Sequence, residues 1–285
     1  MATFTIAKLV IREVVRRKLI LALLALTVLA VALTGWGFSR IPTLTQRGVP
    51  IGEDQVKLIA SQLLILVMFM FGNIIALSSV FIASPALSGD LESGVALSML
   101  ARPIARREYV LGKWLGLAGL VIAYAIASIA VELVAIQIAV GYLPPRPVEF
   151  ALFLVGRGIV LLTFALLLST RLSGMVGGVI ALVLYGMAWL LGVVGGLGAT
   201  FGNETIERVG TVSKLILPTD GLWRGAVYHL EPAIVLAGAN AAGPAAAANP
   251  FYSPAPPPLA YLVWCVFWIL GVLALAMLSF RRREA

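Results

Sequence analysis

Residues 84–113 read SPALSGDLESGVALSMLARPIARREYVLGK, and long apolar runs lie on both sides of them. Ser84 is a residue type favoured as a helix N-cap, Pro85 suits the first helical position, and Pro103 ends the pattern. Between the prolines, apolar residues recur every four positions, which predicts one stripe along a helix over 86–101: Leu87, Leu91, Val95 and Met99. The stretch therefore predicts a short amphipathic helix at one side of a membrane, with an apolar stripe that needs a cover.

The charges of this stretch follow the polarity of the predicted helix. Asp90 and Glu92 lie near its start, where the helix dipole favours acids, and Arg102 lies near its end. A further basic residue, Arg106, follows the second proline, and Lys113 enters the next apolar run. The N-cap residue, the apolar stripe and the terminating proline thus follow one another in the order expected of a helix.

This order of residues resembles the loop between spans two and three of type-2 ABC transporter permeases, which carries a coupling helix that docks on the ATPase subunit. The match consists of two acids, a glycine, Arg-Pro-x-x-Arg and Gly-Lys: Asp90, Glu92, Gly94, Arg102, Pro103, Arg106, Gly112 and Lys113. Val95 departs from the family pattern, in which a threonine often follows the glycine. The alternative is a loop that lies on lipid headgroups.

The resemblance implies partners and a set of coupling residues. Loop 84–108 would contact a separate ABC ATPase, of which two copies would serve two permease subunits, identical or different. ATP and Mg would be held by that ATPase, so no cofactor is expected in this chain. The residues expected at the contact are those of the motif and the stripe: Asp90, Leu91, Glu92, Gly94, Val95, Met99, Arg102, Pro103 and Arg106.

Composition places the chain in the membrane. Of its 285 residues 61% are hydrophobic and only 12% are charged, whereas soluble domains carry roughly 25% charged residues. The formal net charge of +8 suits loops that face anionic lipid, since no basic groove with interleaved aromatic residues indicates nucleic acid. The single cysteine, Cys265, forms no internal disulfide.

Apolar runs long enough to cross a bilayer predict an all-α, polytopic protein with six spans over 19–285. The predicted spans cover about residues 19–38, 58–83, 109–140, 150–169, 175–197 and 259–280. Residues 1–18 predict an interfacial amphipathic helix, which the resemblance identifies with an elbow helix. Its apolar face contains Phe4, Ala7, Ile11 and Val14. Three pairs of glycines, each separated by four positions, predict close helix packing: 112/116, 174/178 and 192/196.

Lysine and arginine gather at the N-terminus, in loop 84–108, at Arg171 and at the C-terminus, which predicts that both termini are cytoplasmic. By family resemblance the membrane is the inner membrane of a prokaryote. The outside loop 198–258 predicts short helices at 204–217 and after 217, with Asp220 as a cap, followed by a flexible link over 232–258. In the family, short helices here dip into the outer leaflet; a surface loop is the alternative.

Two charges lie inside predicted spans. Counted from the span ends, Glu132 lies about 13 Å deep and Arg157 about 12 Å deep, so adjacent antiparallel helices would set them level. We therefore predict an intramembrane ion pair, with a polar lining of the transport path as the alternative. Asn73 is a further polar residue at membrane depth, for which an interhelical hydrogen bond is expected.

Residues for catalysis are missing from the sequence. His229 is the single histidine, and no Gly-x4-Gly-Lys-Ser/Thr phosphate loop occurs. The chain is therefore predicted not to be an enzyme, and to hold no metal. The sequence favours a permease subunit of an ATP-driven ABC exporter that forms the translocation pathway; a non-transport membrane scaffold or assembly factor is the alternative.

Overall fold

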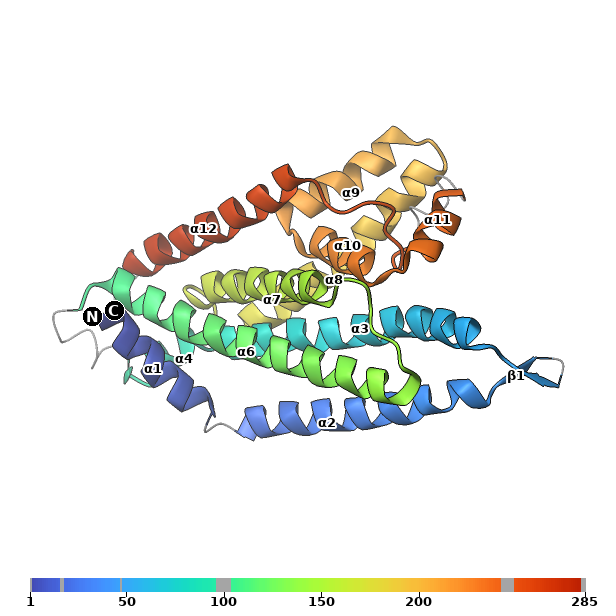
Figure 1. Ribbon diagram of the computed structural model, residues 1–285. Helices are drawn as coiled ribbons and strands as arrows, with labels where there is room; N and C mark the ends of the chain where they lie inside the picture. The colour runs from blue at the N-terminus through green and yellow to red at the C-terminus, as the bar shows by residue number, and fades with distance from the viewer. Residues whose placement is uncertain (1, 16–17, 47, 96–103, 242–248, 283–285) are drawn as a thin grey trace.

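The computed structural model describes residues 2–15, 18–46, 48–95, 104–241 and 249–282 (Figure 1). Within these ranges six helices are long and apolar enough to cross a membrane, which confirms the all-α, six-span prediction. They are α2 (Lys18–Ser39), α3 (Glu53–Ala83), α6 (Arg106–Val140), α7 (Pro147–Ser169), α8 (Gly174–Thr200) and α12 (Leu259–Arg281). The start of α1 and the end of α12 lie at one end of the bundle, which we call the terminal end (Figure 1).

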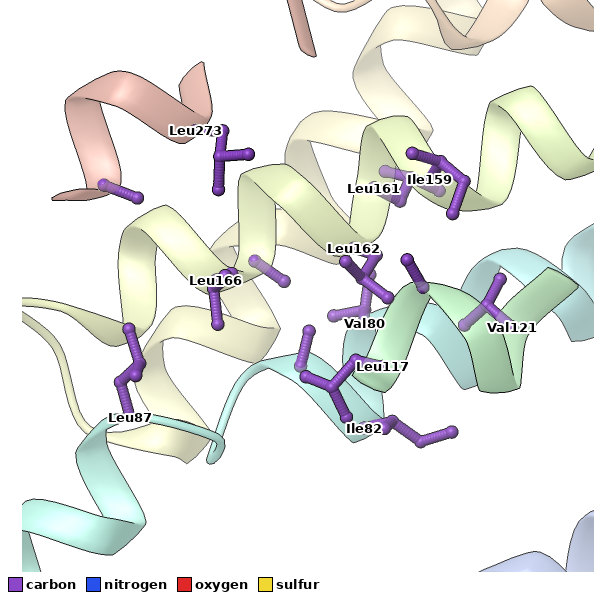
Figure 2. Close-up of a cluster of buried hydrophobic side chains, with 14 of the residues drawn as sticks. Val80, Ile82, Leu87, Leu117, Val121, Ile159, Leu161, Leu162, Leu166 and Leu273 are labelled. Carbon is purple, nitrogen blue, oxygen red and sulfur yellow. The ribbon is translucent and has the colours of Figure 1, made fainter. Parts of the chain in front are cut away.

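The helices α3 and α7 form the interior of the bundle. In their most apolar windows 56% of residues are buried, against 11% in α2 and 17% in α12. Helix α7 packs against α3, α6, α8 and α12, so apolar side chains from four segments meet around it (Figure 2). The outer helices present their apolar surfaces away from the bundle, as expected where lipid or a second subunit replaces water.

An N-terminal helix, α1 (Ala2–Val15), packs on the first half of α6. The contact is close because α6 carries glycines there: a Cβ at Gly112 would lie 2.7 Å from Cβ of Ile6, and one at Gly116 would lie 2.7 Å from the Ala7 carbonyl. This contact buries only part of the predicted apolar face of α1. Val14 is buried, whereas Phe4 remains 75% exposed.

The predicted single helix over 86–101 is wrong. Ser84 is the C-cap of α3, since its N–H donates to the Val80 carbonyl at 2.8 Å, and it does not begin a new helix. A short helix, α4, covers only Ser88–Glu92 and ends before Gly94, whose φ is +75°. A left-handed backbone at that glycine interrupts the helical path. Met99, Arg102 and Pro103 lie outside the described residues.

The opposite end of the bundle carries short elements. Between α2 and α3 lie η1 (Ile41–Thr43) and a hairpin of β1 (Thr45–Gln46) and β2 (Val49–Pro50). Between α8 and α12 lie α9 (Glu204–Ile216), α10 (Thr219–Leu230) and α11 (Ala233–Ala241). Two predictions need correction: Pro218, not Asp220, occupies the N-cap position of α10 and makes no side-chain cap hydrogen bond, and the predicted flexible link contains α11. The buried α10 packs along the first half of α7.

Candidate functional site

A charge cluster with two buried members and one exposed member joins three elements at the terminal end of the bundle. The Lys113 ammonium on α6 lies 2.5 Å from Oδ2 of Asp90 on α4 and 3.7 Å from Oε2 of Glu13 on α1. The Tyr109 hydroxyl, one turn before Lys113, donates to the same Asp90 oxygen. Lys113 and Asp90 are 6% and 7% exposed. Three segments far apart in sequence are thus joined through one ammonium group, which we call the Lys113 cluster.

The segment that leads into α4 is also fastened to α7. Ser169, the last residue of α7, accepts hydrogen bonds from the backbone N–H groups of Leu87 and Ser88, each at 3.1 Å. These are donors that the first turn of a helix leaves without an internal partner. Because the Leu87 side chain is also fully buried in the core around α7, the segment is held by backbone and side chain together (Figure 2).

The turn between α7 and α8 completes this attachment. A Cβ at Gly174, the first residue of α8, would lie 3.0 Å from Cα of Pro85, and one at Gly178 would lie 3.2 Å from Oγ of Ser84. The predicted close packing at these two glycines is therefore present, and its partner is the end of α3. Segment 84–92 accordingly packs on α6, α7 and α8 at once, and Lys113 links it to α1.

The predicted coupling residues divide into a buried and an exposed group. Leu91 packs against the core and Asp90 is buried, so neither lies at the surface expected of a docking rim. Glu92, the last residue of α4, is exposed, and Val95, which follows the turn at Gly94, is 43% exposed. The spacing of apolar residues does not indicate which surface covers the stripe. Here the core of the protein itself covers the first half of the stripe, Leu87 and Leu91.

Several residues of this site were not recognised in the sequence. Lys113 was noted only as part of a motif, and Tyr109 and Ser169 carried no signal that distinguishes them from other residues at span ends. Glu13 did carry one, because it is the only acid in the otherwise basic first 18 residues. Arg106, which was expected at the ATPase contact, donates to the Arg281 carbonyl at 3.1 Å.

The predicted ion pair between Glu132 and Arg157 is wrong. Arg157 is 1% exposed, and its Nη2 donates to the Tyr185 hydroxyl, which donates in turn to Oδ1 of Asn73 at 2.5 Å. The guanidinium also lies over two aromatic rings, 4.9 Å from the Tyr185 centroid and 5.5 Å from that of Trp223. Aromatic faces and a hydroxyl thus replace the expected carboxylate. The interhelical hydrogen bond predicted for Asn73 is confirmed.

The register of α6 against α7 explains the error. A Cβ at Gly158 would lie 3.0 Å from Cγ1 of Val121, so α7 near Arg157 is level with α6 near Val121. Glu132 lies eleven residues further along α6, about 16 Å at 1.5 Å per residue. Helix α6 continues past the start of α7, and residues 141–146 return along it (Figure 1). Equal counts from the span ends therefore do not give equal depths.

Glu132 is completely buried between α6 and α2. Its two carboxylate oxygens accept no hydrogen bond from any residue that the structure describes. The polar group that faces it is the Thr34 hydroxyl, which donates instead to the Ala30 carbonyl at 2.8 Å. A buried carboxyl group without a partner is costly in its charged form.

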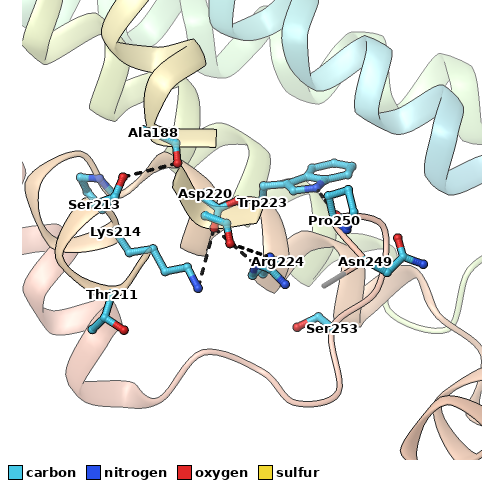
Figure 3. Close-up of polar contacts among 12 residues, drawn as sticks. Ala188, Thr211, Ser213, Lys214, Asp220, Trp223, Arg224, Asn249, Pro250 and Ser253 are labelled. Atoms are coloured by element: carbon cyan, nitrogen blue, oxygen red, sulfur yellow. Dashed lines mark hydrogen bonds and ion pairs between the residues drawn. The ribbon is translucent and has the colours of Figure 1, made fainter. Parts of the chain in front are cut away.

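A second charge cluster lies at the opposite end (Figure 3). Oδ2 of Asp220 lies 3.3 Å from Nε of Arg224 and 3.8 Å from Nζ of Lys214, and Arg224 also donates to the Gly192 carbonyl at 3.3 Å. Burial first, and then the positive charge of Arg224, lower the pKa of the Lys214 amine. This Asp220 cluster fastens α9 and α10 to α8. Over the described ranges no three His, Cys, Asp or Glu side chains gather to hold a metal ion.

The chain was compared with known protein families, and a family model matches it. Residues 4–285, nearly the whole chain, match the model described as ABC-2 family transporter protein. No curated protein matches the chain at the level required for a relationship. The match spans both charge clusters and all six spanning helices.

Proposed function

The chain belongs to the ABC-2 family of transporter proteins, and from this premise we propose that it is an exporter permease that couples to a separate ATPase through loop 84–108. Family membership and six apolar helices make it a multi-pass membrane protein with a permease role in an ABC transporter. The export direction, the point of coupling and the pairing of two permease subunits belong to the proposal.

The observation that carries the proposal is the combination of exposure and anchoring in segment 84–95. Glu92 and Val95 are exposed, whereas a few residues earlier Leu87 and Asp90 are buried against α7 and α6. A force applied at the exposed residues therefore reaches the spanning helices through packed side chains and a buried ion pair. Such a connection favours movement as a rigid body, which is how ATP-driven closure of a partner would alternate access.

The arrangement of the termini supports the orientation. The basic N-terminal helix, the start of α6 and the end of α12 lie at the same end of the bundle as α4 (Figure 1). The positive-inside rule puts this end in the cytoplasm, where an ATPase has access to it. We infer that this ATPase binds ATP and Mg, and that hydrolysis takes place there and not in the permease.

The test measures how much ATPase is captured by a permease variant whose exposed residues in segment 84–95 carry altered charges. Val95→Glu combined with Glu92→Lys changes two exposed residues and leaves the anchors intact, so membrane insertion and thermal stability should stay at wild-type values. We expect at least a tenfold loss of ATPase recovered in pull-downs and a matching loss of permease-stimulated ATP hydrolysis. The matched control is Ser93→Ala, an exposed position between the two.

Leu91→Glu is a less informative change, because Leu91 packs on the core and its substitution would also disturb folding. If the Val95 and Glu92 double variant retains full capture and full ATPase stimulation, segment 84–95 is not the coupling element. A permease that shows no stimulation with any ATPase encoded beside it would favour the scaffold function instead.

A further inference from the structure

A groove lies between the first turn of α6 and the last turns of α12, at the terminal end of the bundle. Its volume is about 650 Å³, and it is open to the exterior. One wall is formed by Ala105, Arg106 and Arg107, and the other by α12. It is separate from the Lys113 cluster, which lies on the side of α6 that faces α1 and α4.

The mouth of the groove is strongly basic. Arg106, Arg107 and Arg281 line it, and Arg282 follows on the exposed end of α12. None of its lining residues within the described ranges is acidic. The nearby Glu108 carboxylate is engaged, since it accepts a hydrogen bond from the Ala105 N–H at 3.2 Å. The mouth therefore suits an anion that can reach several guanidinium groups, such as a phosphate.

The floor of the groove is apolar. Ala274, Met277 and Leu278 recur at helical spacing on α12 and lead directly to Arg281. Leu278 is 51% exposed, and Leu275 beside it is 55% exposed. From Ala274 to Arg281 the helix rises about 10 Å, enough to lie along the upper half of an acyl chain. A soluble anion would leave this floor uncovered.

Hydrogen bonds fix the position of the end of α12 beside the groove. Arg106 donates to the Arg281 carbonyl at 3.1 Å, and Arg171, from the turn after α7, donates to the Ser279 carbonyl at 3.1 Å and its hydroxyl at 3.0 Å. Two arginines from different segments thus fix the last turn of α12 beside α6. The walls are preorganised, which lowers the cost of binding.

From the basic mouth, the apolar floor and the position at the end of two spanning helices, we propose that the groove binds an anionic phospholipid. The phosphate contacts Arg107 and Arg281, and one acyl chain lies along Met277 and Leu278. Basic pockets between spanning helices are a recurrent way to hold anionic headgroups. A phospholipid is favoured over an acidic surface of a partner protein because the floor extends along a membrane-spanning helix. The proposal does not depend on coupling through loop 84–108.

Native mass spectrometry of the full-length protein tests this proposal with phosphatidylglycerol, phosphatidylcholine and inorganic phosphate as probes. We expect retention of phosphatidylglycerol over phosphatidylcholine, and no displacement by excess inorganic phosphate. Arg107→Gln and Arg281→Gln should each weaken phosphatidylglycerol binding about fivefold. Arg208→Gln, an exposed arginine in a surface ion pair on α9, is the control for the same charge change and should have no effect.

A second variant separates charge from space. Leu278→Trp adds volume to the floor at an exposed position and leaves every arginine in place, so it should reduce lipid retention without lowering the melting temperature. Equal binding of the two lipids, or retention unchanged by the arginine and tryptophan substitutions, would overturn the proposal. Displacement of the lipid by inorganic phosphate would also overturn it, because the ligand would then be a soluble anion. So would a Leu278→Trp variant that loses ATPase capture but retains as much lipid as the wild type, because the groove would then be a protein-binding surface.

Discussion

The two charge clusters of this protein use the same chemistry over very different distances along the chain. In the Lys113 cluster one cation lies between acids at positions 13 and 90, so the ion pairs connect segments from the first 113 residues. In the Asp220 cluster one acid lies between cations at positions 214 and 224, which belong to neighbouring short helices. The first joins elements from distant parts of the chain, whereas the second lies mainly within one local unit.

Burial differs as well and sets the expected energies. The side chains of Lys113 and Asp90 are 7% and 11% exposed, so neither charge can be rehydrated without a change of structure. In the Asp220 cluster the acid is only 1% exposed and Arg224 12% exposed, but Lys214 is 30% exposed and can turn toward solvent if Asp220 is replaced. Replacement of the shared central residue should therefore cost more in the Lys113 cluster, where an acid stays buried, than in the Asp220 cluster.

The largest effect is expected for Lys113→Met. The variant leaves the Asp90 carboxylate buried without its ammonium partner, so the unfolding free energy should fall by about 3–5 kcal/mol. Hydrogen exchange should show release of both α1 and α4. The measurement is the thermal unfolding midpoint in detergent, with Lys57→Met, an exposed lysine on α3, as the control. The double variant Asp90→Asn, Lys113→Met should recover part of the loss; equal midpoints for the two single lysine variants would contradict the comparison.

A smaller and local effect is expected for Asp220→Asn. The two cations lose their shared carboxylate, but Arg224 keeps the Gly192 carbonyl and Lys214 has access to solvent. The expected cost is roughly 1–2 kcal/mol, with faster hydrogen exchange confined to α9 and α10. Glu204→Gln, which breaks an exposed ion pair with Arg208 on the same helix, is the control and should change little. Faster exchange at α1 or α4 would show that the cluster is not local.

The smallest effect is expected for Glu132→Gln. Because Glu132 has no partner among the described residues, its neutral replacement should leave the protein unchanged or slightly more stable. A double-mutant cycle with Arg157→Gln should give a coupling energy within error of zero, as for distant sites. Coupling above about 1 kcal/mol would restore the ion pair and would require a different register of α6 against α7.

The spans could be predicted from the sequence because an apolar run of bilayer length has few alternatives. Their ends were harder: α6 begins at Arg106, three residues before the predicted span, because a helix extends beyond the hydrocarbon wherever its first turn is capped. The Glu108 carboxylate provides that cap at the Ala105 N–H. The hydrophobicity of the sequence therefore predicts which residues lie in lipid, whereas the capping residues determine where the helix starts.

The site was harder to predict because periodicity does not identify the covering surface. The spacing of Leu87 and Leu91 was correctly recognised as an apolar stripe, but the surface that covers it is the protein's own core. The positive φ of Gly94 could not be inferred from a glycine that also fits a continuous helix. Arg157 shows a third limit, since depth counted from span ends requires helices that end level, and α6 and α7 do not.

The packing of α1 on Gly112 and Gly116 has a consequence for the order of assembly. The residues that receive Ile6 and Ala7 are synthesised about a hundred residues after them. Helix α1 therefore reaches its final position only after α6 has been synthesised. Until then the apolar face that will contact α6, formed by Ile6, Val10 and Val14, lacks its final cover. A lipid surface can cover this face meanwhile, because Lys8 and Arg12 are exposed basic residues of a type that suits anionic headgroups.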